Sequence, residues 1–149
     1  MSHQKKRWLK IICLTVIFCS FAIPALAERL AVKVKKANIR SGPGSKYEVI
    51  WQVGLYYPLQ ILKKQGQWYN FSDFEGDTGW IHEKLVGKIR TVITSKDKCN
   101  VRSGPGVKNR VVFIADKGVA LKVIGSNGKW LHIQHPDGER GWIHKSLVW

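Results

Sequence analysis

Asn38-Ile39-Arg40-Ser41-Gly42-Pro43-Gly44 returns 62 residues later as Asn100-Val101-Arg102-Ser103-Gly104-Pro105-Gly106. In each heptapeptide a short extended stretch runs into two glycines and a proline. These residues cannot continue a strand or a helix, so the chain must turn there. The correspondence extends without a gap over residues 29–87 and 91–149, which share 19 identical pairs out of 59. The chain is therefore predicted to contain two copies of one small fold.

Short alternating or β-branched runs predict strands in both copies. They occur at 31–35, 49–53, 59–62, 68–71 and 79–82, and again at 111–114, 120–124, 130–133 and 141–144. No stretch keeps helical periodicity over about ten residues. About five short strands per copy are too few for a two-sheet sandwich, so we predict an all-β chain of two tandem small β-barrels. Because the link 88–90 is so short, we expect the two barrels to pack against each other and to behave as one rigid unit.

Residues 1–27 belong to neither copy. They begin with basic residues, continue with the apolar run Ile11 to Ile23, and end in Ala25-Leu26-Ala27, the small-x-small pattern of a signal-peptidase site. The apolar run is shorter than the ~20 residues that a membrane span needs, which favours a cleaved signal peptide over an anchor. We therefore expect an exported protein, periplasmic or extracellular, with no transmembrane segment after cleavage. Its domains are predicted at 28–87 and 91–149, joined by the linker 88–90.

Basic residues dominate the predicted mature chain. Residues 28–149 hold 21 basic and 10 acidic side chains, a net charge of +11. Such a charge favours association with polyanions such as acidic cell-wall polymer, anionic membrane or nucleic acid, and that attraction weakens with salt. The alternative is that the charge serves solubility alone.

The mature chain has one thiol, Cys99, so no intramolecular disulfide is expected. Cys99 takes the place of Ala37 in the first copy, which indicates a small buried strand residue. A catalytic thiol needs a partner His in a cleft, and zinc needs a Cys/His ligand pattern that the chain lacks. We expect no catalytic residue, no cofactor and no metal site.

Three repeated features resemble the bacterial SH3-like (SH3b) domain. They are the Asn-(Ile/Val)-Arg-Ser-Gly-Pro-Gly turn, a Trp 24 residues after its last Gly, and Gly-Trp-Ile-His before a closing Leu-Val. Both copies match, so the resemblance covers nearly all of residues 28–149. It implies a tandem of exported targeting or binding modules, of a kind that often acts on peptidoglycan or its stem peptides beside a wall hydrolase. No hydrolase domain fits in the remaining residues, and the resemblance leaves the ligand open.

Most residues that the copies share are explained by the architecture. Trp can fill a small core, and Asn and Arg can tie the turn to neighbouring backbone. His82 and His144 follow a Trp in a strand, where a hydrogen-bonded His is commoner than a ligand. The predicted scaffold and turn residues are Asn38, Arg40, Gly42, Gly44, Trp68 and Trp80, with Asn100, Arg102, Gly104, Gly106, Trp130 and Trp142 in the second copy.

Aromatic residues that are concentrated in the first copy are the candidate ligand-binding residues, and among them only Trp51 has an aromatic counterpart. They are Tyr47, Trp51, Tyr56 and Tyr57, whose counterparts are Asn109, Phe113, Gly118 and Val119. Flat rings with polar edges suit sugar faces, peptide backbones or exposed Pro. The alternative is that these rings cover the second barrel at an interface between the copies.

The leading functional hypothesis is an exported, non-enzymatic module that binds peptidoglycan or another cell-envelope polymer. The alternative is a periplasmic protein–protein interaction adaptor that holds an envelope protein through a sheet edge or the aromatic patch. Nucleic acid would match the charge, but the export signal and the lack of an evident stacking platform argue against it. The sequence does not give the oligomeric state or show whether one or both copies bind.

Overall fold

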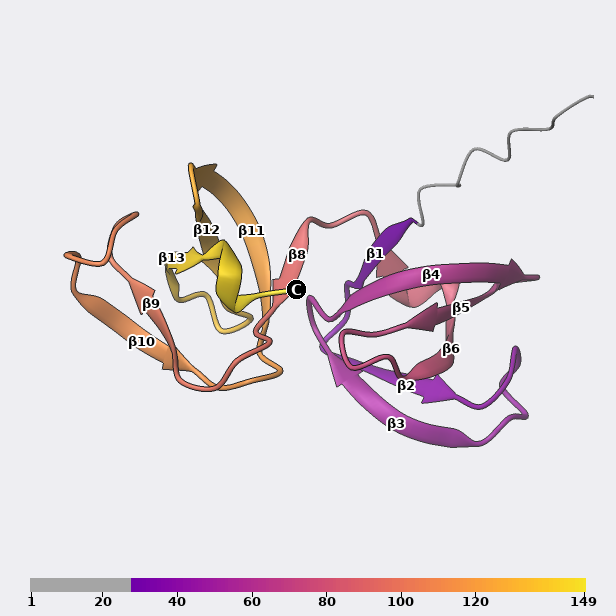
Figure 1. The fold of residues 1–149 in the computed structure, drawn as a ribbon. Coiled ribbons are helices and arrows are strands. Elements are labelled where there is room, and N and C mark those ends of the chain that lie inside the picture. The colour runs from indigo at the N-terminus through magenta and orange to yellow at the C-terminus, as the bar shows by residue number, and fades with distance from the viewer. Residues whose placement is uncertain (1–27) are drawn as a thin grey trace, which may run out of the picture.

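A computed structural model describes residues 28–149 as an all-β chain with two antiparallel sheets, one for each copy of the repeat (Figure 1). The prediction of two small β-domains is confirmed. The predicted signal peptide, residues 1–27, lies outside the described residues. Among the helices of residues 28–149, none is both long and apolar enough to cross a membrane.

The first domain is a seven-stranded sheet in the order β3-β2-β6-β5-β4-β1-β7. It consists of β1 (Arg29–Val32), β2 (Lys36–Arg40), β3 (Val49–Gly54), β4 (Pro58–Gln65), β5 (Trp68–Ser72), β6 (Thr78–His82), the 3-10 helix η1 (Glu83–Leu85) and β7 (Val86–Gly87). The repeated heptapeptide forms the end of β2 and the turn toward β3. This hairpin therefore places β3 at one end of the sheet.

The second domain repeats this order in a six-stranded sheet, β10-β9-β13-β12-β11-β8. It consists of β8 (Thr91–Ile93), β9 (Cys99–Arg102), β10 (Val111–Ala115), β11 (Ala120–Asn127), β12 (Trp130–Gln134), β13 (Arg140–His144) and the 3-10 helix η2 (Lys145–Leu147). A single bridge between Thr94 and Val148 stands where the first domain has the pairing of β1 with β7.

Each domain has its own hydrophobic core. In the first, Ile39, Leu59, Phe71 and Ile81 are fully buried, with ten residues in the cluster. The second domain buries Val101, Leu121, Ile133 and Ile143 at the equivalent positions, with eight residues in the cluster. Strand alternation explains this pattern, because every second side chain of a strand points to the same face.

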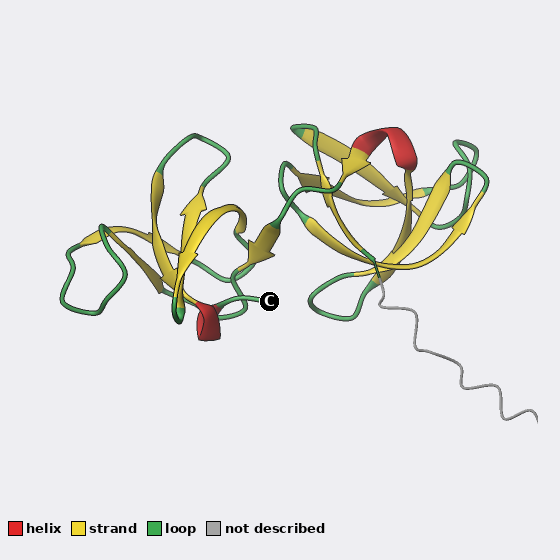
Figure 2. Cartoon of the chain, turned by 90° about the horizontal axis from the view of Figure 1, so that it is seen from above, coloured by secondary structure: helices red, strands yellow, loops and turns green. Residues whose placement is uncertain are grey.

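Two short elements differ from the sequence expectation. β7 has only two residues, too few for an alternating pattern to reveal. Each last hairpin is followed by one turn of 3-10 helix, visible as the two red segments in Figure 2. Both turns are capped by a repeated histidine, since His82 Nδ1 accepts the N–H of Lys84 at 3.1 Å and His144 Nδ1 accepts that of Ser146 at 3.2 Å.

Contacts between the domains include an ion pair and cation–π contacts, one of them between Lys117 and the Phe74 ring. Lys117 Nζ lies 2.6 Å from Glu75 Oε1, and the Arg29 guanidinium lies 3.9 Å from the ring centre of Trp149. Most buried hydrophobic residues of the described chain form two clusters, one per domain, whereas the fully buried Ala31 of β1 and Ile93 of β8 belong to neither cluster. That the two domains behave as one rigid unit stays a prediction.

Candidate functional site

Three central strands of each sheet present a row of polar and aromatic side chains to solvent. In the first domain Arg40 of β2 pairs with Trp80 of β6, which pairs in turn with Asn70 of β5. All three are partly exposed, whereas their chain neighbours Ile39 and Ile81 are fully buried. Because side chains alternate along a strand, burial of these neighbours forces the three to face outward.

A second row lies beside the first. His82 of β6 pairs with Trp68 of β5, and their rings meet edge to face with centroids 5.1 Å apart. Asn38 of β2 lies two residues before Arg40 and therefore on the same side of its strand. We call the six side chains of both rows the outer face: Asn38, Arg40, Trp68, Asn70, Trp80 and His82.

The second domain builds the same outer face with one change. Arg102 pairs with Trp142, and Trp130 meets His144 edge to face at 5.3 Å. The full set is Asn100, Arg102, Trp130, His132, Trp142 and His144. His132 replaces Asn70 and stacks on Trp142, with centroids 4.7 Å apart and planes 6° apart. The first domain instead places Lys63 Nζ 5.4 Å from the ring centre of Trp80.

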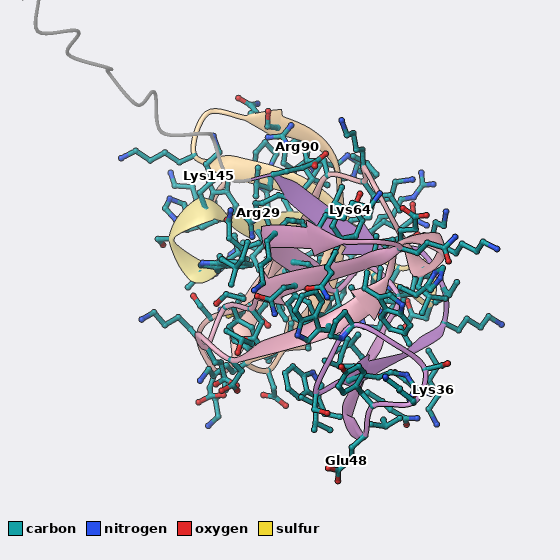
Figure 3. All side chains as sticks on the ribbon, turned by 90° about the vertical axis from the view of Figure 1, so that its right-hand side faces the viewer. Arg29, Lys36, Glu48, Lys64, Arg90 and Lys145 are labelled. Atoms are coloured by element: carbon teal, nitrogen blue, oxygen red, sulfur yellow. The ribbon has the colours of Figure 1, made fainter. Side chains whose placement is uncertain are left out.

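A hollow opens beside the outer face of each domain. In the first it measures about 450 Å³, and its lining includes Lys36, Asn38, Arg40 and Trp68. Lys36 projects from the ribbon at its rim (Figure 3). The hollow of the second domain measures about 250 Å³ and is lined by the equivalent residues Lys98, Asn100, Arg102 and Trp130, together with His144. Neither lining contains a carboxylate, so both hollows offer cationic and amide groups beside an indole ring.

The repeated arginines also hold the hairpin turn. Arg40 Nη1 donates to the carbonyl oxygens of Ser45 at 2.9 Å and Tyr47 at 2.7 Å. Arg102 Nη1 donates to the carbonyl of Asn109 at 2.9 Å. A guanidinium has five N–H donors in a planar fork. These bonds use one nitrogen, so each arginine is fixed in place and retains donors for an anion.

The repeated histidines present one defined nitrogen to solvent or ligand. Nδ1 of His82 and of His144 accepts a backbone N–H from the following 3-10 turn. A neutral imidazole whose Nδ1 accepts must carry its proton on Nε2. Each outer face therefore adds a ring N–H donor next to an indole.

Comparison with known proteins identifies the fold. Residues 33–88 and 95–149 each match the family described as bacterial SH3 domain. The chain belongs to this family. Both SH3 domains contain one complete outer face, because the matched segments begin before Asn38 and Asn100 and end after His82 and His144.

Several proteins that are named as amidases contain regions similar to this chain. The putative N-acetylmuramoyl-L-alanine amidase YrvJ of Bacillus subtilis is 29% identical over 97% of the chain and 31% of its own length. The probable cell wall amidase LytH of Staphylococcus epidermidis is 35% identical over 34% of the chain and 18% of its own length. The chain thus spans about a third or less of these relatives. Among solved structures, an NlpC/P60 family protein from Bacillus cereus aligns with 82% of the chain and 56% of its own, at 14% identity and a TM-score of 0.39.

The four aromatic residues predicted to bind ligand do not gather on one surface of the first SH3 domain. Tyr47 lies before β3 with its ring on Gly42, where an added Cβ would collide with it. Trp51 packs against the core and meets Phe71 edge to face at 6.2 Å. Tyr56 and Tyr57 follow β3, so they lie at the opposite end of that strand from Tyr47.

Tyr57 lies beside the second SH3 domain. It helps to line a hollow of about 550 Å³ that also includes Val119 and Pro136. Its hydroxyl donates to Asp73 Oδ2 at 2.8 Å, and Asp73 Oδ1 accepts the backbone N–H groups of Glu75 and Asp77. The hydrogen bond from Tyr57 to Asp73 thus holds the 73–77 turn near the second domain. Tyr57 therefore has the position expected of a residue at the interface between the domains.

Tyr57→Phe should reduce the loss of folding stability that the wild-type protein shows at alkaline pH. Burial and the hydrogen bond to Asp73 raise the pKa of Tyr57 above its ordinary value. The unfolded chain releases the phenolic proton near pH ~10 while the folded domain keeps it, so the free energy of unfolding falls as the pH rises above about 10. Urea unfolding at pH ~9 and pH ~11 should show a smaller fall for Tyr57→Phe than for the wild type, with Tyr56→Phe as the control. Equal falls in all three proteins would contradict the expectation.

Sequence reasoning assigned the outer face to the scaffold because both copies share it. The signal it missed is strand alternation: Asn38 and Arg40 flank Ile39, and Trp80 and His82 flank Ile81, so the shared polar and aromatic residues lie opposite to the core. Identity at core positions is expected of one repeated fold. Identity at half-exposed positions needs a further reason, and a shared ligand supplies one.

Proposed function

We propose that the protein is a non-enzymatic cell-wall binding module that holds peptidoglycan through the outer face of each SH3 domain. The observation that carries the proposal is that both domains have the same partly exposed set of side chains on their outer faces. Five of the six residues are identical between domains that share only 19 of 59 positions. The outer face replaces the aromatic residues of the first copy as the main candidate site.

The chemistry of the outer face suits the stem peptides of peptidoglycan. Stem peptides carry carboxylates and amides, which match the guanidinium, the asparagine and the rim lysine of each hollow. Indole rings provide flat apolar surface for a sugar face or for a peptide backbone. A lining without carboxylates avoids repulsion of an acidic ligand, and the net charge of +11 over residues 28–149 adds a salt-sensitive attraction.

The comparisons support a wall ligand and an exported location. Two relatives carry names of cell-wall amidases, and the parts of them that resemble this chain are a minor share of their length. A binding role without hydrolysis accords with the one thiol of residues 28–149. Cys99 is 1% exposed, and burial raises the pKa of its thiol, which opposes formation of a nucleophilic thiolate.

Replacing one repeated indole in each outer face should weaken wall binding strongly. Trp68→Ala combined with Trp130→Ala removes the indole that lines the hollow of each outer face, and we expect the affinity for protein-free peptidoglycan to fall by about tenfold or more. Cosedimentation of residues 28–149 with purified sacculi over a salt series measures this. Asn38→Ala with Asn100→Ala is a gentler variant that removes one amide per face and should weaken binding while the domains stay folded.

The matched control is Leu62→Ala with Ile124→Ala. These residues are equivalent in the two domains and exposed at 53% and 37%, but they lie on β4 and β11, outside the outer face. Circular dichroism must show folded protein in each case. Binding that survives in both the Trp and the Asn variants, or that vanishes with salt alone, would reject the outer face as the wall site.

A further inference from the structure

Strand β10 forms an open edge of the second SH3 domain. It stands at the end of the sheet order and pairs on one side with β9. Among the described residues no strand pairs with its other side. An open edge exposes backbone N–H and C=O groups that can accept one more strand, and proteins usually protect such edges with charged side chains.

The sequence of β10 lacks this protection. Val111–Ala115 reads Val-Val-Phe-Ile-Ala, without a polar residue. Ile114 is 59% exposed, and Val111 and Val112 are about two-fifths exposed. Phe113 and Ala115 pack toward the core, and the Phe113 ring meets His135 edge to face. An added strand would therefore find apolar neighbours along the exposed side of β10 as well as free backbone groups.

The equivalent edge of the first domain is built differently. β3 has Gln52 where β10 has Ile114, and Gln52 Nε2 donates to Asn38 Oδ1 at 2.7 Å. Glu48 precedes β3 and projects away from the ribbon (Figure 3). The second domain places Arg110 at that position. Val49 and Ile50 of β3 are as exposed as Val111 and Val112 of β10, so within the two strands the edges differ mainly at Gln52 and Ile114.

We propose that β10 is the docking edge for an extended segment of a partner protein. The segment pairs with β10 as an antiparallel strand, carries alternating apolar side chains, and ends in acidic residues. This edge borders the outer face, because Ile114 is the cross-strand partner of Asn100, but strand pairing at β10 does not depend on the proposed wall binding. It gives a specific location to the adaptor role that a sheet edge can perform.

Charge selects the partner and its direction. Exposed Lys108 and Arg110 precede β10, and exposed Asp116 follows it. In an antiparallel pair the C-terminal end of the added strand lies beside the N-terminal end of β10, so acidic residues at that C-terminal end meet Arg110. A second copy of this chain is a poorer occupant, since both copies carry a net charge of +11 over residues 28–149 and therefore repel each other.

The test uses synthetic peptides and two matched variants of residues 28–149. One peptide alternates valine and threonine and ends in two aspartates, and the control peptide ends in two lysines. Ile114→Lys places a charge on the exposed face of the docking edge. Gln52→Lys makes the equivalent change in the first domain. Fluorescence anisotropy measures binding, and hydrogen–deuterium exchange locates it.

We expect the acidic peptide to bind with added amide protection confined to 111–115. Ile114→Lys should weaken this binding by at least about tenfold, whereas Gln52→Lys and the wild type should bind alike. The lysine-ended peptide should bind more weakly than the acidic one. Absence of binding at millimolar peptide, equal binding by Ile114→Lys, or protection on β3 instead would overturn the proposal. Self-association in sedimentation velocity that Ile114→Lys abolishes would also overturn it, because the occupant would then be a second copy.

Discussion

Phe71→Ala is expected to unfold the first SH3 domain while the second stays folded. Phe71 is fully buried and is the largest side chain of its core. Truncation of a buried Phe costs about 3–5 kcal/mol, because the transfer free energy is lost and a cavity remains. A domain of this size has little stability to lose. The second core shares no buried residue with the first, so it should not respond.

Two-dimensional NMR of residues 28–149 checks this expectation. Resonances of the first domain should collapse to random-coil positions, and those of the second should keep their dispersion. Ile133→Val is the control at the equivalent position of the second domain, where the loss should be only about 0.5–1.5 kcal/mol and both domains should remain folded. Collapse of both domains in Phe71→Ala would instead show that the second domain depends on the first for its stability.

Gly141→Ala is expected to open the second outer face. A Cβ at Gly141 would stand 2.5 Å from Val101 Cγ1 and 2.9 Å from the carbonyl oxygen of Arg102. The backbone of Arg102 cannot move aside as the end of a flexible side chain can. We therefore expect β13 to shift away from β9 at the pair Trp142–Arg102, where the two strands meet. Overpacking of this kind costs about 1–3 kcal/mol. It should also disrupt the hollow between Arg102 and Trp130.

Thermal unfolding and peptidoglycan cosedimentation together measure the effect. Gly141→Ala should lower the stability of the second domain and weaken wall binding through that domain. Gly128→Ala is the control, because its φ of +55° strains an alanine while an added Cβ meets nothing within 4 Å. This control should lose stability and keep its binding. A Gly141→Ala protein that binds as the wild type does would mean that the second hollow contributes nothing.

The duplicated sequence predicted the fold well because turns and cores leave strong local patterns. The heptapeptide at Asn38 located the hairpin turn, and the alternating run at 68–71 lies within β5. The two-residue strand β7 left no such pattern, and it exists only because β1 is there to pair with it. Pairing between distant segments is a tertiary effect that a local pattern does not contain.

The candidate site was harder to predict, because one residue type can serve either face of a strand. Trp68 and Trp80 were assigned to the scaffold, but the register of β5 and β6 turns both outward. Tyr47 and Tyr57 were predicted to share a site, yet they lie at opposite ends of β3. Composition located the aromatic residues in the first copy, and only the register shows which of them lie together.

Three residues, 88–90, separate the last strand of the first domain from the first strand of the second. If both outer faces bind as proposed, so short a connection would let one chain bind a polymer at two places, provided that the polymer repeats the bound group. When one outer face dissociates, the other still holds the chain on the polymer. The free face then experiences an effective ligand concentration on the order of millimolar, so rebinding competes with dissociation of the whole chain. Retention on the wall would then come from avidity, with each face individually weak and the chain still able to move from one attachment point to the next.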